Sequence, residues 1–167
     1  VMSQRQNTKS TSNPTSQTFG WVLASIQEMI DESIYFCETF SHTLHVHHNR
    51  QAAEVFQKAL QSFQQEAHIV LEAIQSHNPP LPKISPWEKP YNGYQHPAVT
   101  LMDADYLITE SAAWLLVENL IQVHQSFYHY LQEAKNNEPQ SSEQTLKLVG
   151  LLIENCSHCR QNSQSLT

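Results

Sequence analysis

The chain has 167 residues, which is enough for one domain with a buried core. Hydrophobic residues make up 40% of it, glycine occurs three times, and no apolar run approaches the length of about eighteen residues that spans a bilayer. This composition predicts a soluble, helix-rich domain and excludes an integral membrane protein. The formal net charge is −7 and the nine Lys and Arg residues are scattered, which excludes a basic surface for nucleic acid.

The N-terminal stretch, residues 1–17, is polar apart from Val1 and Met2. It lacks a secretory signal pattern, so we expect a flexible tail in front of a single domain at 18–167, and a cytoplasmic protein. Three cysteines, an odd number, are typical of a reducing compartment. Ten histidines outnumber Lys and Arg together, which makes metal chemistry a hypothesis to test.

Two helices are predicted in the first half of the chain. Apolar residues recur at three- and four-residue steps over 19–47 and again over about 50–76, which is the helical period. Asn49 is the expected N-cap of the second helix, so the connection is short and the two helices are antiparallel. The first stripe is Val22, Ile26, Met29, Ile30, Ser33, Cys37, Phe40 and Leu44; the second is Ala52, Phe56, Ala59, Leu60, Phe63, Ala67, Val70 and Ile74, with Glu66 at its edge.

A long crossover follows, because residues 76–100 hold most of the eight prolines, which remove amide donors and fix φ. At about 3.3 Å per extended residue, such a segment can pass along a whole helical bundle. Its aromatic side chains either cover the outer seam of the bundle or mark a subunit interface. They are Trp87, Tyr91, Tyr94 and His96.

Two more helices are predicted after the crossover. Thr100 and Asp103 resemble a capping box that opens a helix of about 35 residues and about 50 Å. Pro139 ends it, and Ser142 caps the last helix. The stripes are Met102, Tyr106, Thr109, Ala113, Leu116, Leu120, His124, Phe127 and Leu131, then Thr145, Leu148, Val149, Leu152, Cys156 and Cys159.

The order of helix, short loop, helix, long crossover, helix, short loop and helix predicts an all-α, antiparallel four-helix bundle. With the apolar pairs Val55–Phe56 and Ala59–Leu60 around Glu66, and Phe127–Tyr128 on the third helix, the chain resembles the ferritin-like superfamily, particularly rubrerythrin-type bundles. The resemblance implies the ferritin-like fold with one crossover between the second and third helices, and a homodimer.

The resemblance also implies where a di-iron site would lie, because that site needs a Glu from each of two helices and Glu-x-x-His from the other two. Only one carboxylate, Glu66, stands at these positions, so the standard ligand set is missing. No cofactor is expected, with iron or zinc as the alternative. The aligned positions are Ser33, Leu120, Phe63, Glu66, Cys156 and Cys159.

A second register puts Gln65-x-x-His68 and Asn155-x-x-His158 in the Glu-x-x-His positions, with Glu32 and Glu118 as the single carboxylates. At 100° per residue, His68 lies about 140° and Glu118 about 160° from the centres of their stripes. We therefore expect these side chains to face solvent.

Five residues remain as candidate metal ligands: Glu66, His124, Cys37, Cys156 and Cys159. Glu66 and His124 lie close enough to their stripes to reach the core. Three arrangements are compatible with this: the two side chains contact each other, they bind one metal together with a cysteine, or Glu66 lines the bundle edge while His124 is a core histidine. The alternative for the cysteines is a plain apolar role. A further cluster, His42, His45, His47 and His48, is either a zinc or nickel site or a solvated helix end.

Three functions are compatible with this pattern. The leading hypothesis is a ferritin-like bundle without the standard di-iron ligands that acts as a binding or structural module. The alternative is an atypical metal-binding oxidoreductase of the rubrerythrin or ferritin type. The third is a carrier with a small ligand in the bundle core, in an apolar cavity near Ser33.

Overall fold

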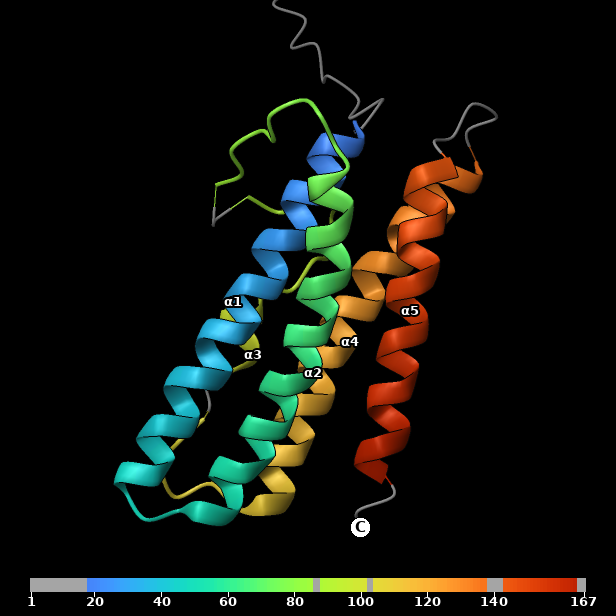
Figure 1. Ribbon diagram of the computed structural model, residues 1–167. Helices are drawn as coiled ribbons and strands as arrows, with labels where there is room; N and C mark the ends of the chain where they lie inside the picture. Colours follow the sequence, from blue (N-terminus) through green and yellow to red (C-terminus); the bar gives the residue numbers. More distant parts are fainter. Residues whose placement is uncertain (1–17, 86–87, 102–103, 138–142, 165–167) are drawn as a thin grey trace, which may run out of the picture.

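The computed structural model describes residues 18–85, 88–101, 104–137 and 143–164 (Figure 1). These residues form helices and turns without a strand, which confirms the all-α fold class. None of the described helices is long and apolar enough to cross a membrane. The helices are α1 (Phe19–Val46), α2 (Arg50–Gln75), the single turn α3 (Pro97–Thr100), α4 (Glu110–Asn136) and α5 (Glu143–Gln164).

The first two helices form an antiparallel pair with nearly the predicted bounds. At the end of α1, His48 has a φ of 62°, its N–H donates to His45 O at 3.0 Å, and Asn49 N–H donates to Leu44 O at 2.8 Å. This pair of bonds is a Schellman motif, which ends the helix and reverses the chain. The reversal brings Phe19, the first residue of α1, into edge-on ring contact with His77, just after α2.

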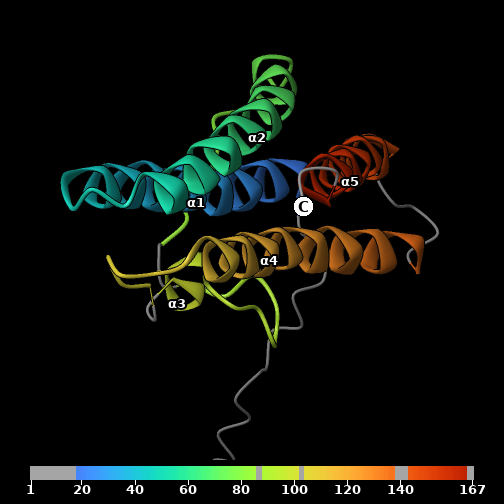
Figure 2. The same ribbon diagram turned by 90° about the horizontal axis from the view of Figure 1, so that it is seen from below.

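The crossover runs along the length of the bundle, as predicted. Asn49 caps α2 through a hydrogen bond from Ala52 N–H, and its side-chain amide also donates to the carbonyls of Tyr106 at 3.1 Å and Ile108 at 2.8 Å. The segment that leaves the end of α2 therefore returns to the start of α2 before α4 begins, so α2 and α4 run parallel (Figure 1). The crossover and α3 lie on the same side of the α1–α2 pair as α4 (Figure 2), and α3 packs against both α1 and α4.

The prediction of one long helix from Thr100 was wrong. α4 begins at Glu110, capped by Thr109, and has 27 residues. The backbone groups before α4 make other hydrogen bonds in place of helical ones. Leu107 N–H donates to Asp105 Oδ1 at 2.8 Å, and the Asn49 side chain donates to the two carbonyls named above. A capping box at Thr100 cannot be assigned, since Asp103 lies outside the described residues. Residues 1–17, Trp87, Met102, Pro139 and Ser142, which also carried predictions, lie outside them too.

The apolar stripes of all four long helices meet in one core, which confirms most of the predicted positions. Tyr106 is an exception, because it lies before α4 and is about half exposed. Glu66 is the more important case: only 2% of it is exposed, which excludes the edge position, one of the alternatives that the sequence left open for this residue. Its polar partners, described below, allow the carboxylate to lie in the core.

Candidate functional site: a buried hydrogen-bond chain beside a pocket

Glu66 and His124 form the centre of a polar chain inside the bundle. Glu66 projects from α2 and His124 from α4, and the His124 side chain is fully buried. His124 Nδ1 donates to Glu66 Oε1 at 2.8 Å. Of the alternatives that the sequence left open for these two residues, the direct contact is therefore the one present.

Two hydroxyl groups extend the chain. Ser33 Oγ on α1 lies 2.7 Å from His124 Nε2, and it also lies 3.0 Å from the carbonyl of Met29, to which it can donate. At the other side, the Tyr128 hydroxyl donates to Glu66 Oε1. Three helices thus contribute to one buried chain, Ser33–His124–Glu66–Tyr128, in which both ring nitrogens of the histidine have partners.

Burial fixes the protonation state of one member of this chain. It raises the pKa of Tyr128 well above the ordinary value of a phenol, and the negative charge of Glu66 adds to the shift. The phenol therefore remains a proton donor at neutral pH. A carboxylate that accepts from two fixed donors is oriented as well as compensated, which is the condition for keeping such a group in a core.

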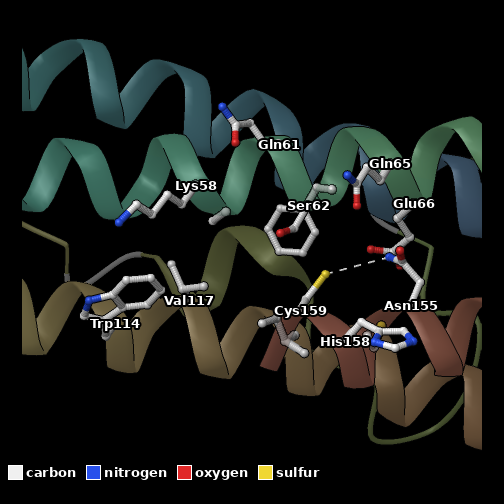
Figure 3. Close-up of a pocket in the computed structure, with 14 residues that line it drawn as sticks. Lys58, Gln61, Ser62, Gln65, Glu66, Trp114, Val117, Asn155, His158 and Cys159 are labelled. Carbon is white, nitrogen blue, oxygen red and sulfur yellow. Dashed lines mark hydrogen bonds between the residues drawn. The ribbon is translucent and has the colours of Figure 1, made fainter. Parts of the chain in front are cut away.

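A pocket with a volume of about 250 Å³ lies between α2, α4 and α5, and Glu66 forms part of its wall. In Figure 3, Glu66 and Asn155 lie at one end of the pocket, and Lys58 and Trp114 lie at the other. Apolar side chains, including Phe63, line it between the two ends. The pocket combines apolar side chains and one buried carboxylate with further polar groups, among them Lys58, Gln65 and Asn155, and small-molecule sites commonly mix apolar and polar groups.

The candidate cysteines divide into two groups. Cys156 and Cys159 line the pocket with Glu66, whereas Cys37 is fully buried and does not. Burial raises the pKa of Cys37 to about 12, and burial together with the Glu66 charge raises the pKa of Cys156 and of Cys159. All three are therefore thiols at neutral pH, which disfavours a role as nucleophiles.

The described residues form no cluster of metal-binding side chains. Among the described residues, no group of three or more His, Cys, Asp or Glu side chains is arranged to hold an ion. His124 has Ser33 and Glu66 on its two nitrogens, so neither nitrogen is open to a metal in this arrangement.

The residues of the second register lie in different places: some line the pocket and others face solvent. Gln65, Asn155 and His158 line the pocket, and Asn155 Nδ2 lies 3.9 Å from Cys159 Sγ (Figure 3). His68 is exposed, as predicted, and its Nε2 lies 3.3 Å from Glu72 Oε1. Glu118 is exposed as well. This register does not assemble into one site.

The histidine cluster at the end of α1 is exposed. His45 Nε2 lies 3.1 Å from Gln57 Nε2, and the His47 ring stacks on Tyr106 with 4.4 Å between centroids. His48 occupies the left-handed position of the helix terminus. These contacts give the histidines local partners at a solvated helix end.

Sequence reasoning missed Tyr128 and the pocket. Tyr128 follows His124 by four residues, so the two share one face of α4, and that spacing could have identified the pair. Ser33 was placed on the core stripe but not linked to His124. The pocket depends on how α5 packs against α2 and α4, which no local pattern encodes.

Comparisons with known proteins add no name to this geometry: no family model, no curated protein and no solved structure matches the chain. The resemblance to ferritin-like bundles therefore stays a prediction from the sequence.

Proposed function

We propose that this protein is a binding module that holds a small ligand in the pocket between α2, α4 and α5. The observation that carries the proposal is Glu66, a core carboxylate that lines the pocket while one of its oxygens is held by His124 and Tyr128. A carboxylate oriented in this way is a ready acceptor for a hydrogen-bond donor on a ligand.

The ligand class follows from the two ends of the pocket. The Glu66 end favours a cationic donor such as a primary ammonium group, because a negative ligand would meet the like charge of Glu66 there and would find a counter-charge only at Lys58, at the opposite end of the pocket. The apolar wall and the Trp114 ring favour an aromatic or aliphatic body. We therefore propose a small amine with an apolar body.

We further propose that the bundle has the ferritin-like arrangement, used here without its metal chemistry. Support comes from the crossover, whose end is fixed to the start of α2 by Asn49. The expected di-iron positions hold Ser33, Phe63 and Leu120, which are buried in the same core as Glu66. Two of the positions that the resemblance assigns to metal ligands, Ser33 and Glu66, belong to the hydrogen-bonded chain.

The proposal is tested with three compounds that share one ring: benzylamine, benzyl alcohol and benzoate. Isothermal titration calorimetry should give the order amine, then alcohol, then acid. Glu66→Gln keeps the shape of the side chain and removes the charge, so it should abolish the preference for the amine. Glu118→Gln, an exposed carboxylate on α4 outside the pocket, is the matched control and should change nothing.

Equal binding of benzoate and benzylamine, or an unchanged preference in Glu66→Gln, would contradict the proposal.

The metal-dependent alternative makes a different prediction. Plasma mass spectrometry of the purified protein would then find near-stoichiometric iron or zinc, lost in the double variant Glu66→Ala and His124→Ala.

A further inference from the structure

A second hollow lies on a different face of α4. It has a volume of about 380 Å³ and is formed by α4, the crossover and α3. Its lining on α4 recurs at steps of three and four residues, through Leu116, Asn119, Val123 and Ser126. We call it the crossover groove. It shares no lining residue with the pocket at Glu66.

The crossover groove contains no charged side chain among its described lining residues, although the chain carries 25 Asp, Glu, Lys and Arg residues, 16 plus 9. Its polar groups are amides and hydroxyls instead, which both donate and accept hydrogen bonds. The remaining lining residues are apolar or glycine. The polar residues are Tyr91, Gln95, Thr100, Asn119, Gln122 and Ser126.

Several of these polar groups have no internal partner. Thr100 is 8% exposed, and its Oγ1 is buried without a hydrogen bond to any described residue. Gln95 and Asn119 also make no hydrogen bond within the described part of the chain, but both are exposed, so water is their ordinary partner. Gln122 differs, because it donates to Ser126 at 3.1 Å and accepts from Arg160 at 2.9 Å. The Thr100 hydroxyl is enclosed in this structure, so its side chain must rotate before a ligand in the groove can recover the free energy that an unpaired buried hydroxyl costs.

We propose that the crossover groove binds a neutral polyhydroxyl ligand, specifically a sugar ring. Each sugar hydroxyl donates and accepts, as do the hydroxyl of Thr100 and the amides of Gln95 and Asn119. An apolar ligand would leave the amides unpaired, and a charged ligand would lose hydration against a lining without charged side chains, since the Arg160 guanidinium that contacts Gln122 is already engaged there. The apolar Leu116 and Val123 give the C–H face of a sugar ring a surface to lie on.

The experiment uses the whole chain and nuclear magnetic resonance titration with methyl glucoside, methyl galactoside and N-acetylglucosamine. At least one should shift the amide signals of Asn119, Val123 and Ser126. Gluconate and glucosamine, which carry a charge on a similar skeleton, should bind more weakly. Thr100→Val should weaken sugar binding about fivefold, the value of one ordinary hydrogen bond.

The matched control is Thr145→Val, since Thr145 Oγ1 is also buried without a partner but lies on α5, outside the groove. It should leave sugar binding unchanged, and both variants should fold at least as stably as the parent. The inference is overturned if none of the three neutral sugars shifts groove signals, if a charged analogue binds as tightly, or if Thr145→Val weakens binding as much as Thr100→Val. Shifts caused by N-acetylglycinamide but by no sugar would assign the groove to peptide amides and contradict it as well.

Discussion

α4 contributes polar residues to two regions that satisfy them differently. Toward α1 and α2 it presents His124 and Tyr128, whose polar atoms bond to Ser33 and Glu66 inside the core. Toward the crossover it presents Asn119, which lines the same groove as Thr100, whose buried hydroxyl bonds to none of the described residues. The difference shows which polar groups must be paired inside a core. A buried carboxylate without partners costs too much free energy, whereas a neutral hydroxyl without a partner costs little enough to be tolerated.

The largest effect should come from breaking the core chain. His124→Leu leaves Glu66 buried with Tyr128 as its remaining partner in the chain, so we expect a loss of about 3–5 kcal/mol in the free energy of unfolding, measured with urea. Asn119→Leu, on the groove side, should stay within about 0.5 kcal/mol of the parent. The double variant Glu66→Leu and His124→Leu should lose much less than the sum of the single variants. Additive losses would show that the two side chains do not act as a pair.

The next effect concerns the anchor of the crossover. Asn49→Ala removes both the α2 cap and two hydrogen bonds to the crossover, so it should cost about 2 kcal/mol. Asn49→Asp retains a capping oxygen and loses the two donors, which isolates the anchor from the cap. A full recovery of stability in Asn49→Asp would mean that the anchor contributes nothing.

A smaller gain is expected from removing hydroxyls without partners. Thr100→Val and Thr145→Val should each raise the free energy of unfolding by about 1 kcal/mol, because a buried polar atom is replaced by an apolar one of similar shape. Thermal unfolding would measure both. A loss of stability in Thr100→Val alone would reveal a hydrogen bond that its groove position makes with water.

The three thiols should differ in reactivity according to their burial. Cys159 is half-buried in the pocket, so iodoacetamide should label it before the buried Cys37 and Cys156. Its raised pKa means that the thiolate is scarce at neutral pH, and labelling should accelerate only as the pH rises past the range of an ordinary thiol. Benzylamine in the pocket should slow the labelling, and a sugar in the groove should not. Mass spectrometry of the labelled peptides would check this order.

Much of the fold follows from local patterns in the sequence. The bounds of α1 and α2 and the Asn49 cap were predicted because apolar periodicity and capping act within a few residues. The passage of the crossover along the bundle followed from its length and prolines. The start of α4 was missed because its competitor, the bond from Asn49 to Ile108, joins residues 59 positions apart.

In the candidate site, too, local patterns predicted some features and contacts between distant residues decided the rest. Stripe angles placed His124 in the core and brought Glu66 within its reach, but they could not show that Glu66 is buried, since burial depends on donors from α4. The pocket and the crossover groove arise from the packing of α5 and of the crossover against α4, and neither has a pattern in a single helix.

The most direct test of the account is one resonance titration of the same protein with benzylamine and methyl glucoside, each alone and then together. We expect two separate sets of shifted amides, around Glu66 and Asn155 for the amine and around Asn119 and Thr100 for the sugar, with neither ligand displacing the other. If both ligands shift one common set, or if the amine leaves the signals around Glu66 unmoved, the division of α4 between a charged pocket and an uncharged groove is wrong.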